Sequence, residues 1–252
     1  MKLNIRNISK SYSNKLVLSS INLNVESGSV YCLLGKNGAG KSTLINIIAN
    51  LLEPNEGSIY FDNLTYSKNE LEVKKRIGLQ SEFNQLIGEL DGRDFLFWIG
   101  LLYKMDKKHL LLQIPRLLNY FFDPEENLDT ICKNYSAGMK KKLAICAAVV
   151  NKPTLLILDE PFANLDPVAA EKLCIFLNAY KDKQRTIFIS SHDLAYVDKI
   201  STHIGILSES KIVFDGTLDD FKENGEISIE YGFQKYIPKS SNNVEHLLSL
   251  II

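Results

Sequence analysis

The sequence predicts an α/β fold with a mainly parallel sheet, an antiparallel β-layer at the N-terminus and an inserted helical subdomain. Three observations support this fold class. Apolar residues recur at every second position in residues 3–5 and 21–25, which is typical of half-buried strands. Residues 154–158 and 186–189 are continuous apolar runs that suit strands buried on both faces. Helical spacing separates such runs, and strands that alternate with helices favour a parallel sheet.

The segment after the N-terminal strands is predicted to form a strand, a loop and a helix. Residues 30–34 are a short apolar run that leads into a glycine-rich stretch. Four later apolar residues follow helical spacing: Leu44, Ile47, Ile48 and Leu51. The helix is expected to stop near Pro54. Residues 58–61 are expected to form another strand after a turn at Gly57.

Helical spacing dominates from about residue 83 to about residue 150. Turn signals at Asp91-Gly92 and Asp123-Pro124 divide this region into several helices. We interpret it as a helical subdomain inserted into the α/β core.

The chain is predicted to hold one domain over residues 1–225. Residues 204–207 and 211–214 flank a short polar turn and are expected to pair as a closing hairpin. Residues 226–252 carry no motif that indicates a role, so we describe them as a C-terminal tail.

The composition is that of a globular protein without a strong electric field. Hydrophobic residues make up 45% and charged residues 23%, which is ordinary for a chain that buries a core. The net charge of −1 gives no large positive field to attract nucleic acid. The lysine run at residues 140–142 is interpreted as a solvated helix face.

Two further features bear on where the protein works. The four cysteines form no CxxC pair and are expected to be reduced thiols of a cytosolic protein. The longest aromatic and aliphatic stretch, residues 95–103, is too short to cross a bilayer. Work at a membrane would therefore require another chain to supply the membrane part.

The glycine-rich stretch matches the phosphate-loop pattern of a glycine, four residues, a glycine, a lysine and a hydroxyl residue. Its glycines let backbone amides turn toward phosphates, Lys41 places a cation on the outer phosphates, and the Ser42 hydroxyl can bind Mg²⁺. The following helix directs its positive N-terminal end at the same anion. The stretch predicts a P-loop NTPase core that binds ATP through these residues: Gly35, Lys36, Asn37, Gly38, Ala39, Gly40, Lys41, Ser42 and Thr43.

Two acids, Asp159 and Glu160, end a buried strand. A carboxylate at the C-terminal end of a parallel strand faces the ligand crevice of an open α/β sheet. Asp159 is therefore expected to hold the Mg²⁺ shell, and Glu160 is expected to polarise a water molecule. The acids could instead cap a helix, but their position after a phosphate loop favours the catalytic interpretation.

Residues 135–139 read Tyr-Ser-Ala-Gly-Met and lie between the phosphate loop and the two acids. Here the sequence resembles the ATP-binding cassette (ABC) transporter family, in which a Leu-Ser-Gly-Gly-Gln signature precedes the Asp-Glu strand. The resemblance covers about residues 2–220. It implies that the signature contacts ATP bound by a partner cassette through these residues: Ser136, Ala137, Gly138 and Met139. Alanine and methionine depart from the family pattern, while the serine and the helix N-terminus are kept.

Three further positions match the family. Residues 163–166 resemble the dimer-contact loop, in which Asp166 is the acidic residue. His192 resembles the switch histidine, which implies a catalytic role beside Glu160. Tyr12 matches the aromatic residue that stacks on adenine.

The glutamine loop of the family has no direct match. By position Glu82 is favoured, because a carboxylate can also serve a metal-bound water, and Gln80 is the second candidate. The region that follows contains five apolar residues, which could line a groove for a permease helix or pack the core of the insertion: Phe83, Leu86, Leu90, Phe97 and Trp98.

The resemblance implies an ATPase that uses ATP and Mg²⁺ and works as a homodimer or heterodimer of nucleotide-binding subunits. A separate membrane permease would hold this cytoplasmic dimer at the inner face of the cell membrane. The signature with its trailing lysines resembles exporter-type subunits that pair with ABC-2 permeases for peptides, antibiotics, lipids or ions. No nucleic-acid partner is expected.

Two other functions remain open at this point. A cassette ATPase of DNA repair or of the ribosome would explain the motifs, but such proteins usually carry coiled-coil arms, zinc-binding cysteines or two cassettes. A P-loop kinase would explain the phosphate loop but not the ordered signature, acidic pair and histidine.

Overall fold

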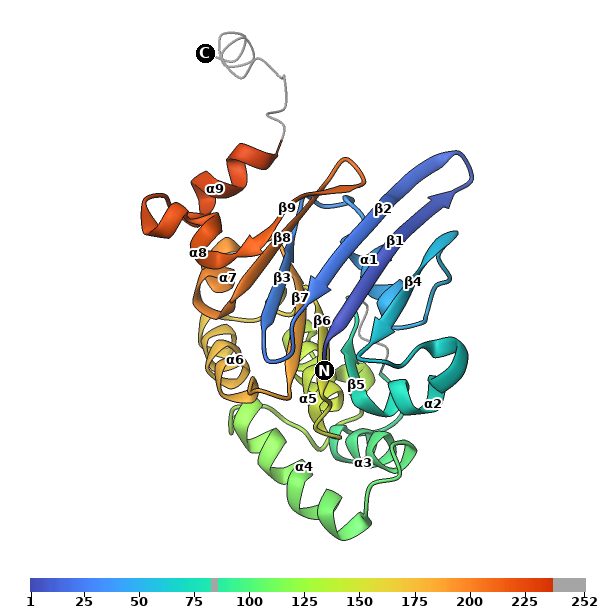
Figure 1. Ribbon diagram of the computed structural model, residues 1–252. Coiled ribbons are helices and arrows are strands. Elements are labelled where there is room, and N and C mark those ends of the chain that lie inside the picture. Colours follow the sequence, from blue (N-terminus) through green and yellow to red (C-terminus); the bar gives the residue numbers. More distant parts are fainter. Residues whose placement is uncertain (83–85, 238–252) are drawn as a thin grey trace.

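The computed structural model describes residues 1–82 and 86–237 of the 252 residues. The N-terminal layer is a three-stranded antiparallel sheet with the order β2-β1-β4 (Figure 1). It contains β1 (Leu3–Tyr12), β2 (Lys15–Val25) and β4 (Glu56–Phe61). The antiparallel layer predicted from the alternating pattern is therefore confirmed.

The second sheet has six strands in the order β5-β6-β7-β3-β8-β9. The first five run parallel, and β9 pairs antiparallel with β8. The mainly parallel sheet and its closing hairpin are therefore confirmed. The strands are β3 (Val30–Leu34), β5 (Ile77–Gln80), β6 (Leu155–Asp159), β7 (Thr186–Ser191), β8 (His203–Ser208) and β9 (Lys211–Thr217).

Strand β3 lies in the middle of the parallel sheet, between β7 and β8. The chain leaves β3 through the glycine-rich stretch and enters α1 (Lys41–Ile48). The loops after β5, β6 and β7 emerge at the same edge, because parallel strands end together. This edge is where an open α/β sheet binds its ligands.

The parallel sheet is buried on both faces, which is why its strands read as continuous apolar runs. Tyr31 and Leu33 of β3 belong to a core shared with α1 and the antiparallel sheet. Cys32 and Leu34 point to the opposite core, which contains residues of α5 (Ala137–Val149) and α6 (Pro167–Tyr180). Alternate residues of β3 thus pack into the two hydrophobic cores, one on each face of the parallel sheet.

Residues 86–150 lie between β5 and β6 and form a helical region at the lower end of Figure 1. It contains α3 (Gly92–Leu102), α4 (Lys107–Phe121), the short 3₁₀ helix η1 (Cys132–Asn134) and α5. The side chain of Asp91 caps α3 and that of Asp106 caps α4. The predicted turn at Asp91-Gly92 thus coincides with the start of a helix. The exact limits of an inserted subdomain stay a prediction.

Three local features differ from the sequence-based expectation. The helix α2 (Tyr66–Arg76) and the strand β5 follow β4, although β5 has only four residues and no alternating pattern. Helix α1 ends at Ile48, because Asn50 adopts a left-handed conformation with φ 56°. Leu51, which was expected on the apolar helix face, is therefore exposed.

Small helices precede and follow the closing hairpin in the sequence. These are α7 (Leu194–Ile200), which precedes β8, and α8 (Leu218–Phe221), η2 (Glu223–Gly225) and α9 (Ile229–Tyr236), which follow β9. Ile229 of α9 is buried in the core that contains Cys32. In the described part of the chain, none of the helices combines the length and apolar character needed to cross a membrane.

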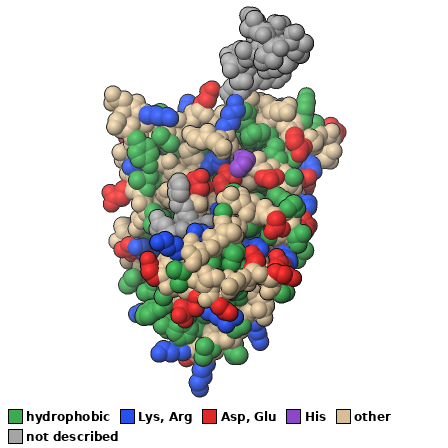
Figure 2. All heavy atoms as spheres, turned by 180° about the vertical axis from the view of Figure 1, so that it is seen from behind, with side chains coloured by type: hydrophobic (Ala, Val, Ile, Leu, Met, Phe, Trp, Pro, Cys, Tyr) green, Lys and Arg blue, Asp and Glu red, His purple; other side chains and the backbone are tan. Residues whose placement is uncertain are grey.

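The surface carries both signs of charge. Figure 2 shows basic and acidic side chains interspersed over the face opposite to that of Figure 1. This mixture agrees with the formal net charge of −1.

Candidate active site

The phosphate loop has a backbone that requires glycine at two positions in particular. Gly40 has φ 109° and lies against the hairpin of the antiparallel sheet, where an added Cβ atom would be 3.0 Å from Val17 Cγ1. An added Cβ atom at Gly35 would lie 2.5 Å from the carbonyl oxygen of Leu207. The loop is therefore pressed between two strands, and its amides begin α1.

Lys41 is 6% exposed and lies inside this loop. Its Nζ atom donates to the carbonyl oxygens of Gly35 at 2.9 Å and Lys36 at 3.4 Å. The same ammonium is 3.3 Å from the Glu160 carboxylate. The loop thus holds a cation beside a carboxylate.

Oxygen atoms gather next to this cation. The Ser42 hydroxyl donates to the Glu82 carboxylate at 3.3 Å. Asp159 is buried at the end of β6, and burial raises the pKa of its carboxyl. Hydrogen bonds from Ser190 and Ser42 lower that pKa, while the negative charges of Glu82 and Glu160 raise it.

These oxygens could hold a magnesium ion together with phosphate. In residues 1–82 and 86–237, no three or more His, Cys, Asp or Glu side chains are grouped as metal ligands. A Mg²⁺ ion does not need such a cage, because it keeps several waters and takes one or two carboxylates plus phosphate oxygens. Ser42, Asp159 and Glu82 supply donors of that kind.

Glu160 follows β6 and has a left-handed backbone with φ 49°, which is strained for a residue with a side chain. Its N–H donates to the carbonyl oxygen of Ser190 at 3.2 Å and to the Ser190 hydroxyl at 3.1 Å. Its carbonyl oxygen accepts from Lys141 Nζ at 3.1 Å. The backbone is therefore held from both sides.

The Glu160 carboxylate bridges two elements of the site. One oxygen is 3.3 Å from Lys41 Nζ, and the other is 2.8 Å from Nδ1 of His192. The backbone N–H of His192 also donates to this second oxygen at 3.3 Å. His192 follows β7 and its side chain is 56% exposed, so the imidazole can reach a ligand from the solvent side.

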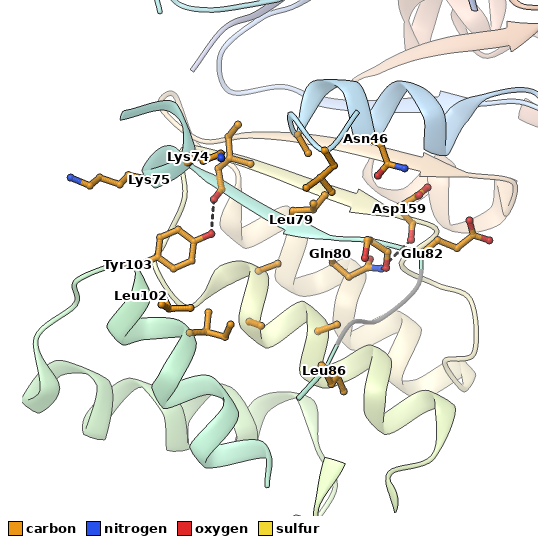
Figure 3. Close-up of a pocket in the computed structure, with 18 of the residues that line it drawn as sticks. Asn46, Lys74, Lys75, Leu79, Gln80, Glu82, Leu86, Leu102, Tyr103 and Asp159 are labelled. Atoms are coloured by element: carbon orange, nitrogen blue, oxygen red, sulfur yellow. Dashed lines mark hydrogen bonds between the residues drawn. The ribbon is translucent and has the colours of Figure 1, made fainter. Parts of the chain in front are cut away.

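The two candidates for the glutamine loop occupy different places. Glu82 contacts Ser42, as described above, and lies at the open end of the site (Figure 3). Gln80 is buried at the end of β5, and its amide nitrogen donates to the carbonyl oxygen of Asp159 at 3.1 Å. Its other amide atom, Oε1, has no hydrogen-bond partner among the described residues. Glu82 therefore contacts the hydroxyl of the phosphate loop, while Gln80 holds the backbone at the end of β6.

The signature residues form the start of α5. The Ser136 side chain accepts from the backbone N–H of Met139 at 3.1 Å and so caps the helix. Gly138 lies beside the dimer-contact loop, since an added Cβ atom would be 3.0 Å from the carbonyl oxygen of Asn164. Ala137 and Met139 occupy the first turn with it. The departures from the family pattern therefore leave the helix N-terminus intact.

Two other predicted residues have local partners. Asp166 caps α6 by accepting from the N–H groups of Val168 and Ala169, and these bonds lower its pKa. Tyr12 is 48% exposed at the tip of the β1–β2 hairpin, the same hairpin that supplies Val17. The ammonium of Lys10 lies over the ring of Tyr12, 5.6 Å from its centroid.

The lysine run is not a solvated helix face, contrary to expectation. Lys141 and Lys142 are only 1% and 4% exposed. Lys142 pairs with Glu126 at 2.8 Å, while Lys141 reaches Glu160 as described. Lys140 donates to the carbonyl oxygen of Lys133. The expectation failed because a run of lysines does not reveal that the helix is surrounded on several sides.

Ser190 and Lys141 are site residues that the motifs do not indicate. Ser190 is fully buried, and its hydroxyl donates to the carboxylate of Asp159. The pairing of Asp159 with Ser190 between β6 and β7 is the signal that could have revealed it. No feature of the sequence points to Lys141.

A groove of about 700 Å³ opens next to the site. Figure 3 shows Asp159 and Glu82 at one end of it and Tyr103, Lys74 and Lys75 at the other. Its walls come from α1, α2, β5, α3 and α5. The groove thus joins the oxygen cluster to the helical region.

The five apolar residues expected near this groove have different environments. Leu86 lines it, Leu90 and Phe97 pack against the core, and Trp98 is 54% exposed. Phe83 lies outside the described residues.

Comparisons with known proteins agree with this geometry. Residues 18–163 match the family described as ABC transporter. The lantibiotic transport ATP-binding protein SrtF of Streptococcus pyogenes is 33% identical over 217 residues, which cover 86% of this chain and 91% of that protein. The bacitracin transport ATP-binding protein BcrA of Bacillus licheniformis is 30% identical, over 89% of this chain and 72% of that protein.

Solved structures show the same architecture. The ATP-binding subunit of an ABC transporter superposes with a TM-score of 0.85 and 29% identity, over 94% of this chain and 99% of that chain. A bacterial ABC transporter cassette solved as a dimer has a TM-score of 0.77 at 24% identity, over 86% and 98% of the two chains. With the family match over residues 18–163, these comparisons identify the chain as an ATP-binding member of the ABC transporter family.

Proposed function

We propose that this chain hydrolyses ATP to ADP and phosphate and couples a dimerisation cycle to export by a separate membrane permease. The observation that carries the proposal is the position of the Glu160 carboxylate. It lies 3.3 Å from the phosphate-loop cation Lys41 and 2.8 Å from His192. A carboxylate held between these groups is suited to orient a water molecule toward a terminal phosphate.

ATP binding begins at the phosphate loop. The loop amides and the N-terminus of α1 bind the β- and γ-phosphates, and Lys41 exchanges its bonds to the loop carbonyls for bonds to phosphate oxygens. Tyr12 stacks on the adenine from the hairpin above. Ser42 and Asp159 are the residues that would hold a Mg²⁺ ion, with Glu82 beside them, and such an ion would neutralise charge on the phosphates.

Hydrolysis then depends on Glu160 and His192. Glu160 accepts a hydrogen bond from the attacking water and aligns it with the γ-phosphorus. His192 holds one carboxylate oxygen and contacts the γ-phosphate from its exposed side. The bond between water and phosphorus forms as the bond to the ADP oxygen breaks, so phosphate and ADP are released.

A second cassette completes the site. Ser136 and the first amides of α5 form an anion-binding helix N-terminus at which a phosphate of the partner's ATP can bind. Asp166 and Asn164 lie on the loop beside Gly138 and would meet the partner there. Two chains arranged head to tail would thus enclose two ATP molecules, and hydrolysis would reopen the pair.

The groove beside Glu82 is the proposed contact with the permease. It is lined by apolar residues of α3 and α5, and its far end carries Lys74 and Lys75. A short cytoplasmic helix of the permease that binds in this groove would contact Glu82, the residue that is hydrogen-bonded to Ser42. This contact would hold the dimer at the cytoplasmic face of the membrane, and the membrane chain would select the cargo.

The names of the relatives support a transport function, and one of them supports export. They describe transport of a lantibiotic and of bacitracin, and export of Nod factor. We therefore propose an ABC-2 type permease for peptides or related amphipathic compounds as the partner.

The decisive experiment compares the ATP turnover of the parent protein with that of Glu160→Gln. The variant keeps the size of the side chain but removes the carboxylate, so we expect turnover to fall by a factor of about 100 or more. Light scattering with ATP and Mg²⁺ should show that the variant accumulates as a dimer. Glu171→Gln, which changes an exposed ion pair with Lys199, is the matched control and should retain parent turnover. Equal turnover of Glu160→Gln and the parent would overturn the proposed mechanism.

A further inference from the structure

Lys141 is a buried lysine in a place where burial is costly. It lies on α5 and is 1% exposed. Burial lowers its pKa, and the negative charges of Asp159, Glu160 and Glu82 oppose that effect. An ammonium group is tolerated in such a place when charges and hydrogen bonds compensate it. Lys141 is thus a second cation beside these three acidic residues, in addition to Lys41.

The contact that Lys141 makes is with the backbone of the catalytic glutamate. Its Nζ atom donates to the carbonyl oxygen of Glu160 at 3.1 Å. That peptide belongs to a residue with φ 49°, a conformation that persists only where the surroundings impose it. Ser190 holds the N–H of the same residue. Ser190 and Lys141 therefore hold the backbone of Glu160 together, one at its N–H and the other at its carbonyl oxygen.

We infer that Lys141 is a positioning residue for hydrolysis, which fixes the backbone of Glu160 so that its carboxylate points at the attacking water. The inference rests on the proposed role of Glu160. Without the lysine, the peptide after β6 can relax toward an ordinary conformation and carry the carboxylate away from Lys41 and His192. ATP would still bind, since the phosphate loop does not depend on this contact.

Lys141 lies on the helix that begins at Ser136, so its contact with Glu160 would also respond to the partner cassette. Ser136, at the N-terminus of the same helix, is proposed to face the nucleotide of the partner cassette. A movement of α5 on ATP-driven closure would therefore reach Glu160 of its own site through Lys141. In a dimer, the first part of α5, from Ser136 to Lys141, would thus link the partner's nucleotide to Glu160 of the chain's own site.

The test measures kcat and KM for ATP in Lys141→Met, which has a similar length but no donor. We expect kcat to fall about 10- to 100-fold, as for a misplaced catalytic group, while KM changes by less than about threefold. Lys141→Gln keeps an amide donor on a side chain one atom shorter and should restore part of the lost kcat. Circular dichroism checks folding, and Lys141→Leu replaces the methionine variant if that variant does not fold.

Lys142→Met is the matched control, because Lys142 is equally buried on the same helix but pairs with Glu126 and Asp123 away from the site. It should retain the parent kcat even if it unfolds at lower urea concentration. Equal kcat in the Lys141 variants and the parent, or an equal loss in Lys141→Met and Lys142→Met, would overturn the inference. If Glu160→Gln is inactive while Lys141→Met is fully active, only the inference fails. If Glu160→Gln itself is fully active, the proposed function fails first.

Discussion

At the scale of single residues, Ser190 shows how a site depends on a side chain that never meets the ligand. Its hydroxyl donates to Asp159 and accepts from the backbone of Glu160, so one buried group serves both acids. The serine lies on β7, directly opposite Asp159 in the register of the sheet. The pairing of β6 with β7 therefore brings one hydroxyl to the carboxylate of Asp159 and to the backbone N–H of Glu160.

Ser190→Ala should weaken both stability and metal use. The change leaves a buried carboxylate oxygen without its donor, so we expect the free energy of unfolding to fall by about 1–3 kcal/mol in urea titrations. Turnover should also require a higher Mg²⁺ concentration, because the orientation of Asp159 is lost. Ser29→Ala removes a hydroxyl bonded to Glu26 at the start of β3 and should leave the Mg²⁺ requirement unchanged. An unchanged requirement in Ser190→Ala would contradict this role.

Buried thiols make the protein sensitive to alkali. Burial raises the pKa of Cys132 and of Cys174 to about 11. Unfolded thiols titrate near pH 8.5, so their contribution to stability is complete below about pH 8.5 and is lost as the pH rises toward 11. The urea concentration at which half of the protein is unfolded should therefore decrease when the pH is raised from 7.5 to 9.5. The double variant Cys132→Ala, Cys174→Ala should show a smaller fall, and an identical fall would assign the effect to other groups.

At the scale of elements, the contact between β5 and α5 fixes how far the oxygens of Glu82 and Asp159 lie from the helix that begins after Ser136. Gly78 of β5 lies against the last part of α5, where an added Cβ atom would be 1.9 Å from the carbonyl oxygen of Ala148. Two residues later, Gln80 supports Asp159. A strand of four residues thus has no room to shift at either end.

Gly78→Ala should separate this strand from the helix. The added methyl group meets the backbone rather than a flexible side chain, so we expect a loss of about 1–3 kcal/mol in the free energy of unfolding. Turnover should also fall, because Glu82 follows the displaced strand. Gly88→Ala is the control, since its added Cβ atom would make an ordinary contact at 3.5 Å with Lys133. Equal stability of the two variants would show that the sheet absorbs the shift without cost.

A strand or helix can be predicted when its own residues carry the pattern, and cannot when its neighbours in the fold determine it. Strands β6 and β7 were predictable because burial on both faces demands continuous apolar residues. Strand β5 was not, since its pairing with β6 supplies what its four residues lack. The end of α1 was missed for a similar reason, because a left-handed Asn50 leaves no mark in the apolar spacing.

At the scale of the whole molecule, the fold and most of the candidate site could be predicted because the motifs stand at the ends of the parallel strands. Asp159 ends one of those strands, and the phosphate loop, Glu160 and His192 each follow one, so the topology alone brings them together. Lys141 could not be predicted, because its burial depends on how α5 packs beneath the sheet. The burial of Lys141 is thus a tertiary effect that no local sequence pattern encodes.

The central position of β3 also determines when the molecule can first bind nucleotide during its synthesis. The strand that carries the phosphate loop leaves the ribosome well before both of its neighbours in the sheet, β7 and β8. Until residues 186–191 have emerged, β3 has neither partner in the parallel sheet. Until residue 207 has emerged, the loop also lacks the Leu207 carbonyl against which Gly35 packs. ATP therefore cannot guide the folding of the growing chain, and the nascent protein must keep its apolar central strand from aggregating by other means.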